Sequence, residues 1–184
     1  APANAPWSVS AGSANTVAEN ASIGDTVGIT ALATDPDGTE TVTYSLSEDA
    51  GGLFTIDTNT GVVTVANALD YETATSHSIT VLATSSDTST SSQAFTINVT
   101  DINESAVGPV TDNDGTANTV AENASIGDTV GITALATDPD GTDTVTYSLS
   151  DDAGGLFTID TNTGVVTVAN ALDYETATSH SITV

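Results

Sequence analysis

The segment Val27-Gly28-Ile29-Thr30-Ala31-Leu32-Ala33-Thr34 has an apolar side chain at every second position, namely Val27, Ile29, Ala31 and Ala33. Successive side chains of a β-strand point to opposite faces, so this alternation predicts a strand with one face against a core. The same eight residues return at positions 130–137. The segment therefore predicts a β-rich chain in which one structural unit occurs twice.

The repeat extends far beyond this segment. Residues 14–81 and 117–184 differ at only two positions, where Glu40 becomes Asp143 and Glu48 becomes Asp151. Both exchanges keep the negative charge, which predicts solvated positions rather than metal ligands. The offset of 103 residues between the copies is the size of a self-contained domain and is longer than a helical or leucine-rich solenoid unit. We predict two tandem domains, residues 1–104 and residues 105–184.

Other alternating segments follow along the first copy, and turn sequences such as Asp35-Pro36-Asp37-Gly38 separate them. The expected strands are residues 16–18, 27–33, 42–46, 54–56, 63–65, 77–83 and 95–99. Short strands at intervals of about 8–12 residues are typical of a β-sandwich, and no segment has the 3.6-residue period of a helix. We predict an all-β protein made of two tandem seven-stranded Greek-key β-sandwiches.

The second copy ends at Val184, which corresponds to Val81, so we expect it to lack its last strand. Two explanations are open: a boundary of an excised piece, or a gap that a strand from another chain fills. Because no signal peptide begins at Ala1, we expect an internal fragment.

The chain has no Lys or Arg, 25 Asp and Glu residues, and a formal net charge of −25. Nucleic acids are excluded as partners, because contacts to phosphate need a basic surface. Divalent cations are the expected counter-ions, since carboxylate oxygens are the ligands that hard cations prefer. No apolar run reaches the roughly 18 residues of a membrane span, so no membrane insertion is expected. The absence of Cys removes disulfides.

Acidic motifs recur near the strand ends, and their order resembles that of the cadherin repeat. The motifs are Ala-Glu-Asn at 18–20, Asp-Pro-Asp-Gly at 35–38, Leu-Asp-Tyr-Glu at 69–72 and Asp-Ile-Asn-Glu at 101–104. The cadherin family has x-Glu-Asn, Asp-x-Asp, Leu-Asp-x-Glu and Asp-x-Asn-Asp-Asn-Ala-Pro in this order. Phe54-Thr55-Ile56-Asp57 followed by Gly61-Val62-Val63 also resembles its mid-domain signature. The resemblance implies sandwiches of cadherin type across the first copy, and across the second as far as it extends.

The same resemblance implies a Ca²⁺ site at the junction of the two repeats. Its implied ligands are Glu19, Asp70, Glu72, Asp101, the carbonyl of Ile102, Asn103, Glu104, Asp138 and Asp140. Asp35 and Asp37 would form half of an upstream site, and Glu122, Asp173 and Glu175 half of a downstream one. We expect such half sites to bind weakly.

Several positions depart from the family pattern. Glu104 stands where the family usually has Asp, and Ser85 also replaces an Asp, which leaves two or three ions per junction open. The linker carries Asp112 and Asp114 in place of Asn-Ala-Pro; they are either additional ligands or part of a polar turn. Trp7, in the sequence Asn4-Ala5-Pro6-Trp7, is expected to plug the end of its own sandwich.

Catalytic chemistry finds no support in the sequence. The two histidines, His77 and His180, are one repeated position on a strand face, where packing at the core or edge is expected. No Ser/His/Asp set, phosphate-binding loop or zinc spacing is present, and the Asp clusters lack an aromatic-rich cleft. We therefore expect no enzyme.

The sequence predicts a calcium-stiffened spacer of a secreted adhesin of the RTX type at the bacterial cell surface. Its expected partners are calcium and the neighbouring repeats of the same polypeptide, and the fragment is expected to be a monomer. Near-identical copies favour this function, since they suit an array that sets length. The alternative is that the repeats themselves mediate calcium-dependent cell adhesion, by self-association or by binding glycans.

Overall fold

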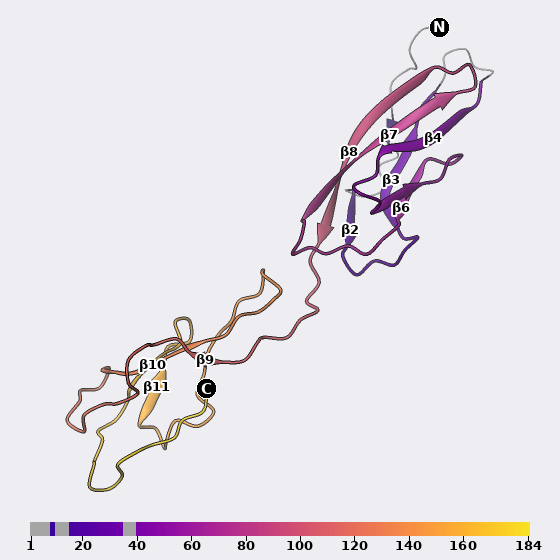
Figure 1. Cartoon of the computed structure of the whole chain (residues 1–184). Coiled ribbons are helices and arrows are strands. Elements are labelled where there is room, and N and C mark those ends of the chain that lie inside the picture. The colour runs from indigo at the N-terminus through magenta and orange to yellow at the C-terminus, as the bar shows by residue number, and fades with distance from the viewer. Residues whose placement is uncertain (1–7, 10–14, 35–39) are drawn as a thin grey trace. The chain divides into compact units, whose positions relative to one another are not determined.

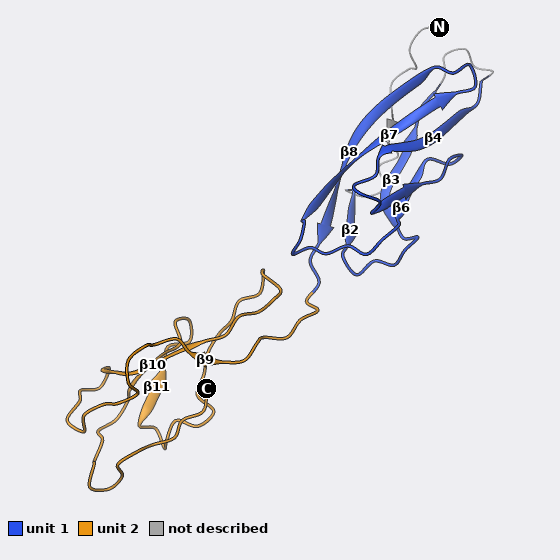
Figure 2. Ribbon diagram, viewed as in Figure 1, with its two compact units in different colours: residues 1–102 blue, residues 103–184 orange. Residues whose placement is uncertain are grey.

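The computed structural model describes residues 15–34 and 40–184, together with the backbone of Ser8–Val9. The chain divides into two compact units, Ala1–Ile102 and Asn103–Val184 (Figure 2). The sequence-based boundary after Glu104 stays a prediction. All regular elements of the described residues are β-strands, and these residues contain no helix long and apolar enough to cross a membrane. The prediction of an all-β chain is confirmed.

Unit 1 is built from two four-stranded sheets (Figure 1). One sheet has the order β1-β3-β6-β5, with β1 (Ser8–Val9), β3 (Thr26–Leu32), β6 (Val62–Val65) and β5 (Phe54–Ile56). The other has the order β2-β8-β7-β4, with β2 (Thr16–Ala18), β8 (Thr90–Thr100), β7 (Ser76–Ser85) and β4 (Val42–Glu48). Each strand from β2 to β8 overlaps a predicted one, with β7 and β8 longer than predicted, and β1 is an addition that pairs with β3.

The alternation in β3 determines which side chains enter the core of unit 1. Val27 and Ile29 are 0% and 1% exposed, whereas Leu32 is 51% exposed on the opposite face. Facing residues of the second sheet, such as Ile79 and Ile97, are fully buried against them. The core is therefore the interface between the two sheets, as the period of two predicts.

Strand β8 closes the sandwich of unit 1 because it is central in its sheet. It pairs antiparallel with β7 over nine residue pairs and parallel with the short β2 over three. Its apolar side chains Phe95, Ile97 and Val99 enter the core and are 9%, 0% and 4% exposed. Removing such a strand would leave both neighbours without a partner along the edges that face β8.

Unit 2 contains one of these two sheets. Its order is β11-β12-β10-β9, with β11 (Phe157–Ile159), β12 (Val165–Val168), β10 (Thr129–Leu135) and β9 (Thr111–Asp112). The expected strands that would match β2, β4 and β7 do not form in the described residues; an isolated bridge between Asp151 and Thr183 remains. The described residues of unit 2 thus lack the last strand, as expected, and they also lack the three strands that share a sheet with it in unit 1. The physical reason is that β8 is the strand on which β2 and β7 depend.

Some predicted features lie outside the described residues. They are Trp7 with the preceding Asn4-Ala5-Pro6, and the upstream pair Asp35 and Asp37.

Candidate metal-binding carboxylate clusters

Glu19 organises one end of unit 1. It follows β2 directly and is only 6% exposed. Its Oε2 accepts a hydrogen bond from the N–H of Tyr71 at 2.7 Å, and its Oε1 accepts one from the N–H of Ile102 at 2.7 Å. One carboxylate thus connects the end of β2, the 69–72 loop and the segment after β8.

Two further carboxylates join Glu19 at this end. Glu19, Asp70 and Glu72 each place one carboxylate oxygen within 4.8 Å of the others. The N–H and the hydroxyl of Thr73 both donate to Asp70, and they hold the pKa of that carboxyl below its ordinary value. Asp101, half-buried, follows immediately after the last residue of β8. The first predicted ligand group is therefore assembled within unit 1, with no Lys or Arg in the chain to neutralise it.

A second cluster lies in unit 2, around the buried Asp140. This residue is 2% exposed, and its Oδ2 accepts hydrogen bonds from the N–H groups of Glu104 at 3.0 Å and Ser105 at 2.8 Å. Asp138 Oδ1 accepts a hydrogen bond from the N–H of Asp140 at 3.1 Å. The two aspartates that the sequence predicted are thus held beside the chain that leads into unit 2.

Asp143 is the residue that the sequence interpretation missed. It is exposed, as predicted, but one of its carboxylate oxygens lies within 4.8 Å of oxygens from Asp138 and Asp140. The Nδ2 of Asn103 donates a hydrogen bond to Asp143. The exchange of Glu40 for Asp143 suggested a solvated position, yet the spacing Asp-x-Asp-x-x-Asp from 138 to 143 was a signal for a shared loop.

The predicted downstream group is not gathered in the same way. In the described part of unit 2, Glu122, Asp173 and Glu175 do not come within 4.8 Å as their counterparts in unit 1 do. Glu122 is exposed, and it keeps one of the two equivalent hydrogen bonds, from the N–H of Tyr174 at 3.0 Å. The N–H of Ile102 supplies the second bond in unit 1, and it belongs to the segment that follows β8.

The acidic residues of the linker form a turn. Asp112 Oδ1 accepts hydrogen bonds from the N–H groups of Asp114 at 3.0 Å and Thr133 at 3.1 Å. These donors hold the pKa of Asp112 below its ordinary value, with the Asp114 N–H contributing most. Asp114 Oδ1 in turn accepts from the N–H and the hydroxyl of Thr116. Of the two alternatives for this segment, the geometry favours the polar turn.

The hydroxyl of Ser85 is hydrogen-bonded to a carboxylate of its own unit. It is 4% exposed, and its hydroxyl donates to Glu40 Oε2 at 3.3 Å, while the hydroxyl of Ser86 donates to the same oxygen at 2.7 Å. Ser85, which replaces the Asp of the family pattern, therefore takes part in a hydrogen-bonded contact with Glu40.

The two histidines pack against aromatic rings. The rings of Phe54 and His77 lie 5.8 Å apart in an edge-to-face arrangement, and Phe157 and His180 repeat this contact at 5.8 Å. Each contact matches the prediction of a packing role.

The donor chemistry of both clusters fits a hard cation. Each cluster presents three carboxylates at close range, and Ca²⁺ takes 6–8 oxygen ligands at 2.3–2.6 Å, several of them anionic. Carboxylates this close repel one another unless a cation or a proton lies between them. Residues 101–104, called the seam below, offer backbone carbonyls and the side-chain amide of Asn103. These are further oxygen donors of the kind that Ca²⁺ accepts.

Two tandem β-units of nearly the same sequence, each with a cluster of carboxylates, define a class of repeated β-modules. The family model described as "Cadherin domain" matches residues 14–100 and 116–184. The chain belongs to the cadherin domain family.

Known relatives support this assignment. The chain is 40% identical over 148 residues to human Protocadherin Fat 4, an alignment that covers 78% of this chain and 3% of that protein. Among solved structures, the extracellular domain of Protocadherin GammaB4 has a TM-score of 0.72 at 26% identity, covering 92% of this chain and 30% of that one. Drosophila N-cadherin EC1-4 has a TM-score of 0.68 at 26% identity, covering 89% and 40%. The chain thus spans a small part of these proteins.

Proposed function

We propose that this chain is a calcium-binding tandem repeat that acts as a rigid extracellular spacer, with Ca²⁺ at the junction of the repeats. The observation that carries the proposal is the pair of backbone hydrogen bonds on either side of Asn103. The N–H of Ile102 is bonded to Glu19 of the first cluster, and the N–H of Glu104 is bonded to Asp140 of the second. Two residues of extended chain reach at most roughly 7 Å, so a single short seam tethers both acidic groups.

The proposed ligands follow from this tether. Glu19, Asp70 and Glu72 would act with Asp101, and Asp138 and Asp140 would complete the shell together with the carbonyl of Ile102, Asn103 and Glu104. Asp143 joins the proposed set because it shares the second cluster. We expect two ions, and a third only if another oxygen donor replaces the Asp of the family pattern, which is Ser85 in the first copy. Asp35 and Asp37 are proposed as half of an upstream site, and Glu122, Asp173 and Glu175 as half of a downstream one.

The chain's own residues supply the mechanism of stiffening. Bound calcium would supply the positive charge that this chain lacks. In its absence, the carboxylates on both sides of the seam repel one another, which favours separated arrangements of the repeats. When the charge is neutralised, seam residues 101–104 are held by both clusters at once. Binding to the folded form adds about 2.7 kcal/mol per site at a hundredfold excess over Kd, and extracellular modules of this kind have Kd values of about 10⁻⁴–10⁻³ M.

A seam variant tests the site. In Asp101→Ala with Glu104→Ala, we expect the rise in melting temperature on adding millimolar calcium to be lost. The matched control is Asp112→Ala with Asp114→Ala, which removes two carboxylates from the same linker but from its turn. The quantity compared is the calcium-induced shift by scanning calorimetry, because either pair can also change the melting temperature of the calcium-free protein. Equal shifts in both variants would contradict the proposed ligand set.

Direct adhesion is the competing function, and a measurement of self-association distinguishes it from the spacer function. A spacer stays monomeric with calcium and binds no glycan by itself. Sedimentation velocity at high protein concentration, with calcium and with chelator, measures this directly. A calcium-dependent dimer that persists when residues 179–184 are removed would favour adhesion through the repeats themselves. The role proposed here is structural in either case, without catalysis.

We further propose that the parent protein is a bacterial surface adhesin of the RTX type. The near-identity of residues 14–81 and 117–184 and the absence of Lys, Arg and Cys support this. The relatives named above are animal proteins, so they support the family and not this origin. Sequencing the coding region on both sides tests it: we expect further copies followed by Gly-Gly-x-Gly-x-Asp nonapeptides, whereas an animal-type membrane anchor would contradict it.

A further inference from the structure

Four Asn-x-Ser/Thr sequences occur along the chain, and they begin at Asn20, Asn98, Asn103 and Asn123. This pattern is the acceptor sequence of N-glycosylation where the asparagine lies in an accessible surface loop. The pattern is short and arises easily in a chain rich in Ser and Thr. The surroundings of each asparagine therefore decide which of the four sequences can accept a sugar.

Asn98 is held within a sheet. It lies in β8, and its backbone is paired with Thr16 of β2 on one side and with Ser76 of β7 on the other. Although its side chain is exposed, an enzyme that needs to bend the backbone around the acceptor would have to break hydrogen bonds along both edges of the strand. This sequence is therefore a poor acceptor in the folded chain.

Asn103 is held by hydrogen bonds of its side chain and of the residues that follow it. Its Nδ2, the atom that would bind the sugar, donates a hydrogen bond to Asp143. The next two N–H groups, those of Glu104 and Ser105, donate to Asp140 Oδ2 at 3.0 and 2.8 Å. Both the acceptor nitrogen and the backbone of this sequence are thus occupied.

Asn20 and Asn123 occupy the same exposed turn in the two repeats. In unit 1, the N–H of Ala21 closes the turn by a hydrogen bond of 3.0 Å to the carbonyl of Ala18, and unit 2 repeats this bond at 3.0 Å. Both asparagine side chains are exposed, and within the described residues neither side-chain amide has a hydrogen-bond partner. The nucleophilic nitrogen is therefore accessible at both positions.

The serine two residues further on is also accessible in both repeats. Ser22 and Ser125 are exposed, and their N–H groups donate to Asp25 Oδ2 and Asp128 Oδ2 at 2.9 Å each. Because this bond uses the backbone of the serine, its hydroxyl stays available to a transferase, to which it can donate or from which it can accept a hydrogen bond.

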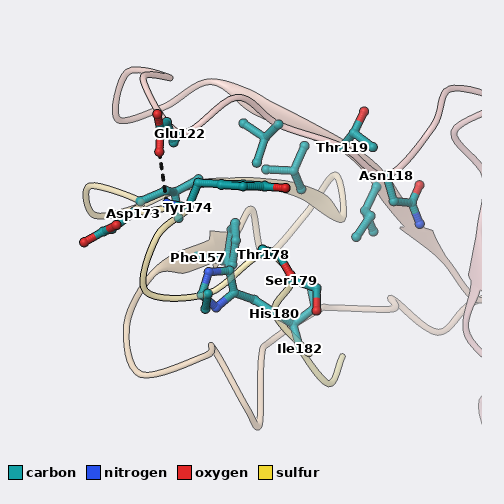
Figure 3. A pocket seen from close by; sticks show the side chains of 15 residues that line it. Asn118, Thr119, Glu122, Phe157, Asp173, Tyr174, Thr178, Ser179, His180 and Ile182 are labelled. Atoms are coloured by element: carbon teal, nitrogen blue, oxygen red, sulfur yellow. Dashed lines mark hydrogen bonds between the residues drawn. The ribbon is translucent and has the colours of Figure 1, made fainter.

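The glutamate that precedes each asparagine is engaged elsewhere. Glu19 accepts hydrogen bonds from the N–H groups of Tyr71 and Ile102, and Glu122 accepts one from the N–H of Tyr174 (Figure 3). The adjacent asparagine takes no part in these contacts. A sugar on the asparagine would leave these hydrogen bonds intact, so modification and calcium binding do not depend on each other.

We propose that Asn20 and Asn123 are N-glycosylation sites, one in each repeat, and that the co-substrate is a sugar activated by phosphate. Asparagine Nδ2 forms a bond to C1 of the sugar, and the bond from C1 to the phosphate oxygen breaks. The phosphate leaves with the electron pair, and one proton of Nδ2 passes to a base of the transferase. A nucleotide and a lipid carrier both supply sugars in this form.

Transfer of glucose to the folded chain tests the selection among the four sequences. The intact 184-residue chain, in calcium, is incubated with UDP-glucose and a glucosyltransferase specific for Asn-x-Ser/Thr. Cleavage before Asp then releases residues 1–24 and 114–127, which separates the two copies for mass spectrometry. We expect one hexose in each of these peptides. Modification of Asn98 or Asn103 to the same extent as Asn20 would contradict the proposal.

A synthetic peptide of residues 94–107 is the control for the effect of the fold. It contains the sequences of Asn98 and Asn103 without the sheet and without Asp140 and Asp143. We expect the enzyme to modify this peptide although it leaves the same residues of the folded chain unmodified. An unmodified peptide would mean that the local sequence, and not the fold, excludes these asparagines.

Variants of the serine test each site within one molecule. Ser22→Ala removes the hydroxyl and keeps the N–H that donates to Asp25, so we expect loss of the hexose at Asn20 and full modification at Asn123. Ser22→Thr keeps a hydroxyl and should keep both hexoses, and Ser125→Ala should lose only the hexose at Asn123. Equal modification of Asn20 in Ser22→Ala and in the unsubstituted chain would exclude the site.

Glycopeptide mapping of the parent protein, isolated from its source, tests whether the sites are used. We expect sugar at both Asn20 and Asn123. Single hexoses would identify a nucleotide-linked donor, and a preassembled oligosaccharide would identify a lipid-linked one. Unmodified Asn20 and Asn123 in the parent protein would overturn the proposal.

Discussion

At the residue scale, the repeat places one glutamate in two environments. Glu19 is 6% exposed and accepts two backbone hydrogen bonds, whereas Glu122 is exposed and accepts one. The flanking residues Ala-Glu-Asn are the same in both copies. The difference in role therefore comes from the segment after β8, which delivers the N–H of Ile102, and not from the local sequence.

Substituting this glutamate tests that difference. Glu19→Gln keeps one acceptor oxygen but turns an amino group towards the N–H of Tyr71 or Ile102. A buried donor without an acceptor costs about 1–3 kcal/mol, so the free energy of unfolding of unit 1 should fall by that amount in chelator. Glu122→Gln is the matched control and should cost less than half as much, because that side chain is exposed. Urea denaturation measures both, and equal losses would show that burial is not the cause.

Turn carboxylates set the response to acid. The N–H of Thr60, then its hydroxyl and the N–H of Asn59, hold the pKa of Asp57 below its ordinary value of 3.8. Because the folded pKa is depressed, this contribution to stability is present above pH 3.8 and is lost as the pH falls through the folded pKa. Thr60→Val removes the hydroxyl alone. We expect the pKa of Asp57 to rise towards 3.8 without reaching it, measured by NMR titration of the carboxyl carbon.

The second copy supplies the control for this titration. The N–H and hydroxyl of Thr163 lower the pKa of Asp160 in the equivalent turn, so Thr163→Val should raise the pKa of Asp160 and leave Asp57 unchanged. A rise at both aspartates in either single variant would mean that the effect is not local.

At the scale of elements, Gly61, at the end of the turn between β5 and β6, lets that turn approach β3 closely. Gly61 has φ of +70°, and a Cβ there would lie 2.3 Å from the carbonyl oxygen of Ala31. An L-residue in this conformation is strained by about 1–2 kcal/mol before any clash is counted. Gly61→Ala should therefore lower the free energy of unfolding of unit 1 by more than about 2 kcal/mol, as measured by chemical denaturation.

Gly24 is the control for the steric part of this effect. It also has a positive φ, +97°, but nothing lies within 4 Å of a Cβ placed on it. Gly24→Ala should be destabilising through backbone strain alone, and hence by less than Gly61→Ala. A larger loss of stability in Gly24→Ala than in Gly61→Ala would show that the contact with Ala31 does not determine the cost of a side chain at position 61.

Strand positions and the repeat could be predicted from the sequence, because the alternation of apolar residues is a local property. Strand β5 (Phe54–Ile56) has the predicted bounds, and the carboxylates that cluster around Glu19 and Asp140 include five that the sequence also singled out, Glu19, Asp70, Glu72, Asp138 and Asp140. The structure of unit 2 could not be predicted in this way. Residues 179–184 have the sequence of a strand, but strand formation also needs a neighbour, which is a property of the whole sheet.

The role of Asp143 was also beyond the local pattern. Its exchange with Glu40 between the copies conserves charge and suggests a solvated position. The two residues nevertheless have different partners: Glu40 accepts from Ser85 and Ser86, and Asp143 accepts from Asn103. These partners lie about 45 and 40 residues away in the sequence, so the distinction depends on tertiary structure.

At the scale of the whole molecule, the proposed stiffening rests on the net charge of −25. Both acidic groups are tethered to residues 101–104, and no basic residue is present to offset their repulsion. Salt screens the repulsion between exposed carboxylates that lie more than a Debye length apart, about 8 Å at 0.15 M, but it cannot hold the repeats in one arrangement. A divalent cation bound by both groups would do so.

Small-angle X-ray scattering of the intact chain, in millimolar calcium and then in chelator at the same ionic strength, measures this stiffening most directly. With calcium we predict a single well-defined maximum dimension and the scattering of a rigid two-body particle. With chelator we predict a broad distribution of dimensions that becomes narrow again when calcium is restored. The variant Asp101→Ala with Glu104→Ala should give the broad distribution in both solutions. Identical scattering of the unsubstituted chain with and without calcium would contradict the proposal that calcium at the seam makes the chain a rigid spacer.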